Sequence, residues 1–183
     1  MAINSRGDVV GNAFGATGWK AVEWPADRPG TVRVLTVPGG AGGLATGIDE
    51  NGTVVGYLTP WPPGTPYVWP TKGHAHPLRI PAGSAGGNAV AVQQGIVAGN
   101  VFDPATGSTD AAEWNLRTGR LTTWPNTGAA LSVNRRGTLG LGGAIVHAGG
   151  RVVPVSGSVY TVSDRGAAAG ATYGNKAELW LGC

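Results

Sequence analysis

Five polar side chains recur at one position along the chain, and together they could hold a small polar ligand or a cation. Each stands two or three residues before a recurring glycine; they are Asn4, Asp49, Gln93, Asn134 and Ser163. Amide, carboxylate and hydroxyl groups gathered around an axis offer both donors and acceptors. The commoner use of such side chains is to form turns with the backbone that follows them. The sequence therefore leaves a binding ring and a set of turns as alternatives.

The three histidines offer a second kind of chemistry. His74 and His76 are two residues apart, so both rings point to the same side of an extended strand and could bind zinc or copper. No third ligand lies nearby and Cys183 is the only cysteine, so we expect a surface turn and no metal site. His147 is a candidate for acid–base catalysis, because it stands where other copies of a repeat have tryptophan.

Two glutamates precede repeated tryptophans. Glu23 and Glu113 occupy equivalent positions, and successive strand residues point to opposite faces. The acids should therefore point away from the face that carries the tryptophans. They could act as paired acids, but we expect solvated charges.

These residues belong to a repeat. An apolar residue, a short polar turn, a glycine and an apolar run recur, as in the stretches INSRGDVVG and IDENGTVVG. The glycines are separated by 45, 43, 42 and 29 residues, at Gly7, Gly52, Gly95, Gly137 and Gly166. We expect glycine at these positions because the turn requires a positive φ.

Each copy contains four short apolar segments separated by turn residues, which predicts a four-stranded antiparallel meander. The spacing of the copies matches the blades of a propeller. We therefore predict one all-β domain, a small β-propeller of about five four-stranded blades with the last blade incomplete. The predicted blades are residues 1–43, 44–87, 88–130, 131–158 and 159–183.

Seven tryptophans divide into two groups. Trp24, Trp69, Trp114 and Trp180 end the second element of their copies, and we expect them to fill the wedges between neighbouring blades. The others lie outside this shared position and are freer to contact a ligand. They are Trp19, Trp61 and Trp124.

The units resemble the HAF-type extracellular repeats of bacteria, which begin A-I-N-x-x-G-x-V-V-G and continue with H-A-F-x-W. The matching residues at the start are Ala2, Ile3, Asn4, Gly7, Val9, Val10 and Gly11. Ala21 with Trp24, and Ala111 with Trp114, match the second element, whereas the histidine and phenylalanine of the family are absent. The resemblance implies a propeller-like fold and an extracellular location. It transfers no catalytic residue.

Composition excludes several partners. The net charge of +3 is scattered along the chain, so we expect no nucleic-acid partner. No apolar run approaches the roughly 20 residues that span a bilayer, so we expect no membrane partner. The start of the chain lacks the features of a secretory signal, so extracellular location rests on the resemblance alone. The sequence suggests no cofactor.

The leading functional hypothesis is a non-catalytic, lectin-like propeller that binds a carbohydrate or another small polar molecule. The alternative is a small bacterial enzyme, a lyase or cyclase, with one acid–base pocket at the degenerate blade near His147 or at His74 and His76. A structural or interaction module is the third hypothesis. No catalytic motif is recognisable, which favours binding over catalysis. Open strand edges at both ends of the array also suggest self-association.

Overall fold

The computed structural model describes residues 1–16, 18–59 and 64–182. Within these ranges the protein is all-β, and a short 3₁₀ turn, η1 (Pro38–Gly40), is the single helical element. The strands form four antiparallel sheets of four strands and a fifth of three, each sheet built from strands consecutive in the chain.

Sheet 1 contains β1 (Ala2–Ile3), β2 (Val9–Gly15), β3 (Gly18–Trp24) and β4 (Arg33–Val34). Sheet 2 contains β5 (Gly43–Ile48), β6 (Val54–Leu58), β7 (Thr65–Trp69) and β8 (His76–Pro77). Sheet 3 contains β9 (Gly86–Gln93), β10 (Ile96–Asp103), β11 (Ser108–Asn115) and β12 (Arg120–Trp124). Sheet 4 contains β13 (Ala130–Val133), β14 (Leu139–Leu141), β15 (Ala144–Val146) and β16 (Val152–Pro154). Sheet 5 contains β17 (Gly157–Val162), β18 (Ala167–Thr172) and β19 (Ala177–Leu181).

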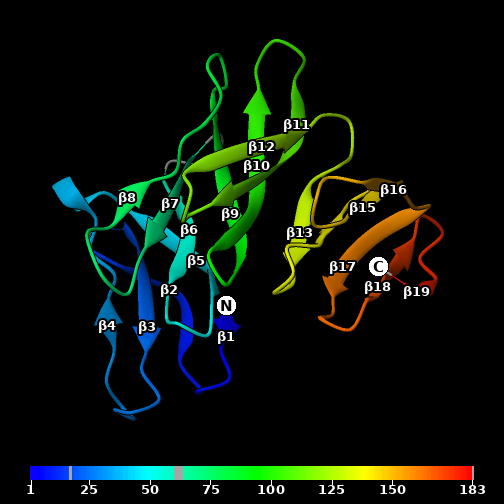
Figure 1. Ribbon diagram of the computed structural model, residues 1–183. Helices are drawn as coiled ribbons and strands as arrows, with labels where there is room; N and C mark the ends of the chain where they lie inside the picture. Colours follow the sequence, from blue (N-terminus) through cyan, green and yellow to red (C-terminus); the bar gives the residue numbers. More distant parts are fainter. Residues whose placement is uncertain (17, 60–63, 183) are drawn as a thin grey trace.

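The sheets follow one another in chain order, and their first strands lie side by side. Figure 1 shows this progression from the blue sheet 1 through the green sheet 3 to the orange and red sheet 5. The first strands of successive sheets contact one another, β1 with β5, β5 with β9, β9 with β13, and β13 with β17. Within the described part of the chain no strand pairing joins sheet 5 to sheet 1, so the sheets do not close by hydrogen bonding. Sheets 2 to 5 begin one or two residues before the segments predicted from the sequence.

The recurring glycines close the turns between the first and second strands. Their φ angles lie between +78° and +88°, which confirms the expected positive φ; the five are Gly7, Gly52, Gly95, Gly137 and Gly166. Glycine is required for a different reason at the last position of the recurring stretch, which is occupied by Gly56 in sheet 2 and Gly99 in sheet 3. A Cβ at Gly56 would lie 1.8 Å from the Leu44 carbonyl oxygen, and one at Gly99 would lie 2.2 Å from that of Asn88. The second strand therefore passes too close to the first for any side chain.

Two of the repeated tryptophans, Trp69 and Trp114, face the preceding sheet. Trp69 and Trp114 are 5% and 3% exposed. The Trp69 indole donates a hydrogen bond to the Thr36 carbonyl oxygen at 3.1 Å, and the Trp114 indole donates to that of Arg79 at 2.5 Å. These two therefore fill wedges between sheets as predicted. Trp24 and Trp180 are only half-buried.

The opposite face of each sheet packs against the following sheet, and this corrects the expectation for the two glutamates. Glu23 pairs across the strands with Val10, which belongs to the core shared by sheets 1 and 2. Glu23 is accordingly 6% exposed, and Glu113 is partly buried. Neither is a solvated charge, because the face that carries each glutamate packs against the following sheet. Burial raises the pKa of Glu113, and nearby Arg120 partly opposes this.

Replacing Trp69 with alanine should lower the free energy of unfolding by about 3–5 kcal/mol, because a large buried side chain leaves a cavity between two sheets. Urea denaturation followed by circular dichroism measures the change. Trp24→Ala is the matched control, since that indole is half-buried and lies over Gly11 of its own sheet. Equal losses in both variants would contradict the wedge between sheets.

Candidate functional site

The five predicted ring residues lie at the turns between the first and second strands. In Asn4, Asp49 and Asn134, Oδ1 accepts hydrogen bonds from the backbone N–H groups two and four residues later, at 2.9–3.1 Å. Ser163 Oγ accepts one from the N–H of Ala167 at 3.0 Å. These side chains thus form the turns that precede the second strands. A ligand-binding role for them stays a prediction.

Two of these side chains also connect neighbouring sheets. Asn4 Nδ2 donates to the Asp49 carbonyl oxygen at 3.3 Å, and Asn134 Nδ2 donates to the Ser163 carbonyl oxygen at 2.8 Å. Asp49 cannot make the same contact when ionised, because a carboxylate only accepts. In Gln93, Oε1 is buried without a hydrogen-bond partner among the described residues.

The residues that follow this position line a cavity of about 420 Å³ where the inner turns meet. We call it the axial cavity, and its lining residues are Ser5, Arg6, Glu50, Asn51, Gln94 and Arg135. The first four sheets all contribute to it. Sequence reasoning missed these residues because no single residue type repeats there. The available signal was that the position after each ring residue is itself polar in all five copies.

Glu50 connects the turns around the axial cavity. Its carboxylate accepts hydrogen bonds from the N–H of Ser5 at 3.0 Å and from the Ser5 hydroxyl, and lies 3.6 Å from Arg135 Nη2. The Ser5 hydrogen bonds, helped by the positive charges of Arg135 and Arg6, lower the pKa of Glu50. Arg135 in turn lies 3.5 Å from the Asp164 carboxylate of sheet 5. Side chains thus link the turns of sheets 1, 2, 4 and 5.

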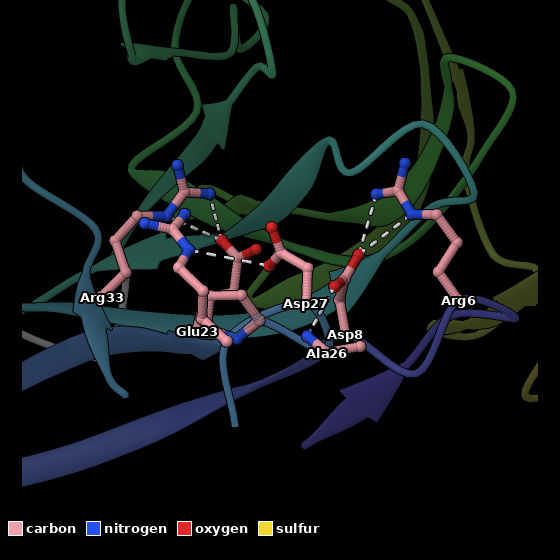
Figure 2. A pocket seen from close by; sticks show the side chains of 8 residues that line it. Arg6, Asp8, Glu23, Ala26, Asp27 and Arg33 are labelled. Carbon is pink, nitrogen blue, oxygen red and sulfur yellow. Dashed lines mark hydrogen bonds and ion pairs between the residues drawn. The ribbon is translucent and has the colours of Figure 1, made fainter. Parts of the chain in front are cut away.

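A second, more strongly charged cavity of about 560 Å³ lies on sheet 1 (Figure 2). We call it the sheet 1 pocket; it is lined by Arg6, Asp8, Glu23, Pro25, Ala26, Asp27, Arg28 and Arg33. These residues come from the β1–β2 turn, from β3, from the β3–β4 loop and from β4. Arg6 lines both cavities.

The carboxylate of Asp8 organises one side of this pocket. Its Oδ1 accepts a hydrogen bond from the Ala26 N–H at 3.0 Å, and its Oδ2 accepts from Asn4 Nδ2 at 3.0 Å and Arg6 Nη2 at 2.8 Å. The Ala26 hydrogen bond, then those from Asn4 and Arg6, lower the pKa of Asp8 despite its burial. Asp8 is therefore a charged structural anchor that joins the first turn to the β3–β4 loop.

The histidine candidates lie apart from both cavities. His74 and His76 are exposed, and His76 Nδ1 donates to the His74 carbonyl oxygen at 2.9 Å, since a carbonyl can only accept. His147 is half-buried and lines a separate cavity of about 410 Å³ with Glu178 and Trp180. His147 Nε2 lies 2.8 Å from Arg151 Nη2; because arginine only donates, this nitrogen carries no proton. No group of three or more potential metal-binding side chains gathers within residues 1–16, 18–59 and 64–182.

The tryptophans proposed for ligand contact are dispersed. Trp19 is 44% exposed and lies edge-on to Phe14, with ring centroids 5.2 Å apart. Trp124 packs against the core of sheets 3 and 4. Trp61 and Cys183 lie outside the described residues. None of the described tryptophans lines the axial cavity or the sheet 1 pocket.

No protein-family model matches the chain, and no curated protein matches it. The resemblance to HAF repeats is thus carried by the motif residues alone. Among the described residues, no helix is long and apolar enough to cross a membrane.

Substituting Asn134 with aspartate should cost about 1–3 kcal/mol of stability. The turn keeps its acceptor, but the donor to the Ser163 carbonyl oxygen is replaced by a repelling carboxylate oxygen. Asp49→Asn is the matched control, since it keeps the acceptor that forms the turn and removes no donor. Chemical denaturation compares them, and a loss in Asp49→Asn as large as that in Asn134→Asp would exclude the contact between sheets as the cause.

The melting temperature of an Asp8→Asn variant should fall less between neutral and acidic pH than that of the unmodified protein. Asp8 has a lowered pKa in the folded state, so its stabilising charge is fully present above the ordinary value of 3.8 and is lost as pH falls through the lowered value. Melting temperatures measured from about pH 7 to about pH 2 should converge in acid.

Glu113→Gln provides a control of opposite sign. The raised pKa of Glu113 means that its charge opposes folding above that pKa, and acid relieves the effect. This variant should match or exceed the unmodified protein in melting temperature at neutral pH.

The Asp8 prediction has its own contradicting outcome. Parallel curves of melting temperature against pH for Asp8→Asn and the unmodified protein would show that the Asp8 charge does not stabilise the fold.

Proposed function

We propose that the protein is a non-catalytic binding module, a propeller-like array in which the five sheets act as blades and the axial cavity receives a small polar ligand such as a glycan. The observation that carries this proposal is that the first four sheets each supply turn side chains to one cavity. A site formed by repeated turns is a natural place for recognition, because the rigid sheets hold the loops in position.

The chemistry of the axial cavity suits a ligand rich in hydroxyl groups. Glu50 provides acceptors, Arg6 and Arg135 provide donors, and Asn51 and Gln94 provide both. A volume of about 420 Å³ lies within the range of small-molecule sites. The hydrogen bond from Ser5 and the ion pair with Arg135 hold the Glu50 carboxylate in place before a ligand binds. This reduces the entropy cost of binding.

The propeller interpretation is supported by the uniform order of the sheets. Each is a meander whose first strand lies beside the first strands of its neighbours. The outer edge of β19 pairs with no other described strand, so self-association through this edge stays part of the proposal. An extracellular location likewise rests on the HAF resemblance.

The enzyme alternative has one supporting observation. His147 and Glu178 line the same cavity between sheets 4 and 5, so a base and an acid could face one substrate in a lyase or cyclase reaction. Arg151 already contacts the accepting nitrogen of His147. Catalysis would require the substrate to displace that arginine, which makes binding at the axis the better supported function.

The test is a glycan and metabolite array, followed by calorimetric titration of the strongest hit into the unmodified protein and the Glu50→Gln and Arg135→Gln variants. We expect one site per chain and an affinity about tenfold lower or worse in each variant, because each loses a charge-assisted contact. Arg117→Gln is the control, as Arg117 is exposed and lies outside all the cavities described. Unchanged affinity in both axial variants, or loss of the hit only in His147→Ala, would overturn the axial site.

A further inference from the structure

The sheet 1 pocket has a charge distribution that distinguishes it from an ordinary salt-bridged surface. Figure 2 shows the carboxylates of Glu23, Asp27 and Asp8 between the guanidinium groups of Arg33 and Arg6. Three arginines and three acids line the pocket, so their formal charges cancel. A plain anion or a plain cation therefore gains little from the pocket as a whole.

Glu23 leaves one hydrogen-bonding site open at the centre of the pocket. Its side chain is 8% exposed, and both contacts from Arg33, through Nε and Nη2, go to Oε2. Within the described part of the chain, Oε1 accepts no hydrogen bond from a protein group, although Glu23 lines the cavity. Oε1 is thus a charged acceptor without a protein donor, and the cavity that Glu23 lines allows a ligand to supply one.

The arginines at the sides keep donors available. Arg33 and Arg6 each direct Nε and Nη2 at one carboxylate oxygen, while their side chains are 57% and 53% exposed. The carboxylates thereby fix the planes of the guanidinium groups and leave the remaining N–H groups for another acceptor. The Arg28 side chain is 67% exposed, and among the described residues it makes one contact, at 3.7 Å with Asp27. Such positioned guanidinium groups are well suited to bind a carboxylate.

We propose that the sheet 1 pocket is a second binding site, separate from the axial cavity, for a sugar acid of the uronic type. The ligand carboxylate pairs with Arg28, whose side chain is the most exposed of the three arginines, and neighbouring hydroxyl groups donate to Glu23 Oε1 and to Asp27. A ligand with donors and an acidic group a few ångströms apart matches the alternation of acids and arginines. The cavity of about 560 Å³ accommodates a monosaccharide unit. The same chemistry describes a free uronate and a uronate residue within a polysaccharide.

The experiment titrates glucuronate, glucose and an oligomer of a uronic acid into the full chain by calorimetry. We expect glucuronate to bind at least about tenfold more tightly than glucose, since the two differ at the carboxylate alone. Tighter binding of the oligomer would identify a polysaccharide as the source, and equal or weaker binding a free sugar acid. Either result supports the site.

Arg28→Gln is the principal variant, because its exposed side chain supports little of the fold, and it should weaken glucuronate about tenfold with an unchanged melting temperature. Glu23→Gln should weaken glucuronate and glucose alike, since it alters the acceptor for hydroxyl groups. Arg117→Gln, an exposed arginine elsewhere, is the matched control. The axial variant Arg135→Gln should leave glucuronate unaffected, so this site and the proposed function can fail independently.

Three results would overturn the proposal. They are equal affinity for glucose and glucuronate, absence of binding at millimolar glucuronate, and an unchanged affinity in Arg28→Gln. Glutamate serves as a further titrant, because an α-amino acid also combines a carboxylate with a donor. Preference for glutamate over glucuronate would replace the sugar acid with an amino acid and would also overturn the proposal.

Discussion

Burial of both faces of each inner sheet is the constraint on which the rest of this structure depends. Adjacent residues of one strand serve different cores: Val54 lies in the core between sheets 1 and 2, and its neighbour Val55 lies in the core between sheets 2 and 3. A meander of four short strands cannot bury two such faces alone. Each sheet therefore depends on its neighbours, and polar residues are tolerated where the sheets end in turns.

The turns between the first and second strands hold polar side chains in defined positions relative to the packed sheets. Asn4 and Asn134 use their oxygen to form the local turn and their amide nitrogen to reach the next sheet. One side chain thus sets both the local backbone and the spacing to the neighbouring sheet. The charged residues that follow, among them Glu50 and Arg135, meet at the axial cavity because the turns have been placed in this way.

Much of the architecture follows from local signals in the sequence. The all-β meanders, the glycines with positive φ and the buried Trp69 and Trp114 are predictable because turn geometry and strand alternation act over a few residues. The functional side chains are less predictable. Ser5 and Glu50 are 45 residues apart, and their contact depends on how one sheet is rotated against the next, which no local period encodes. Strand alternation alone predicts that Glu23, on the face opposite Trp24, is solvated. In the structure the following sheet covers that face.

The two cavities differ in how they could arise and change in evolution. The axial cavity draws its residues from the turns of four sheets, so no single sheet carries it. The residues of the sheet 1 pocket, by contrast, all lie between positions 6 and 33, within one meander. Duplication of that unit would transmit the complete pocket, and divergence of one copy could alter it without disturbing the others. Sheet 3 keeps the equivalent glutamate, Glu113, with Arg120 nearby, but apolar Ile96 follows Gly95 where Asp8 follows Gly7, so this meander lacks the carboxylate that anchors the sheet 1 pocket.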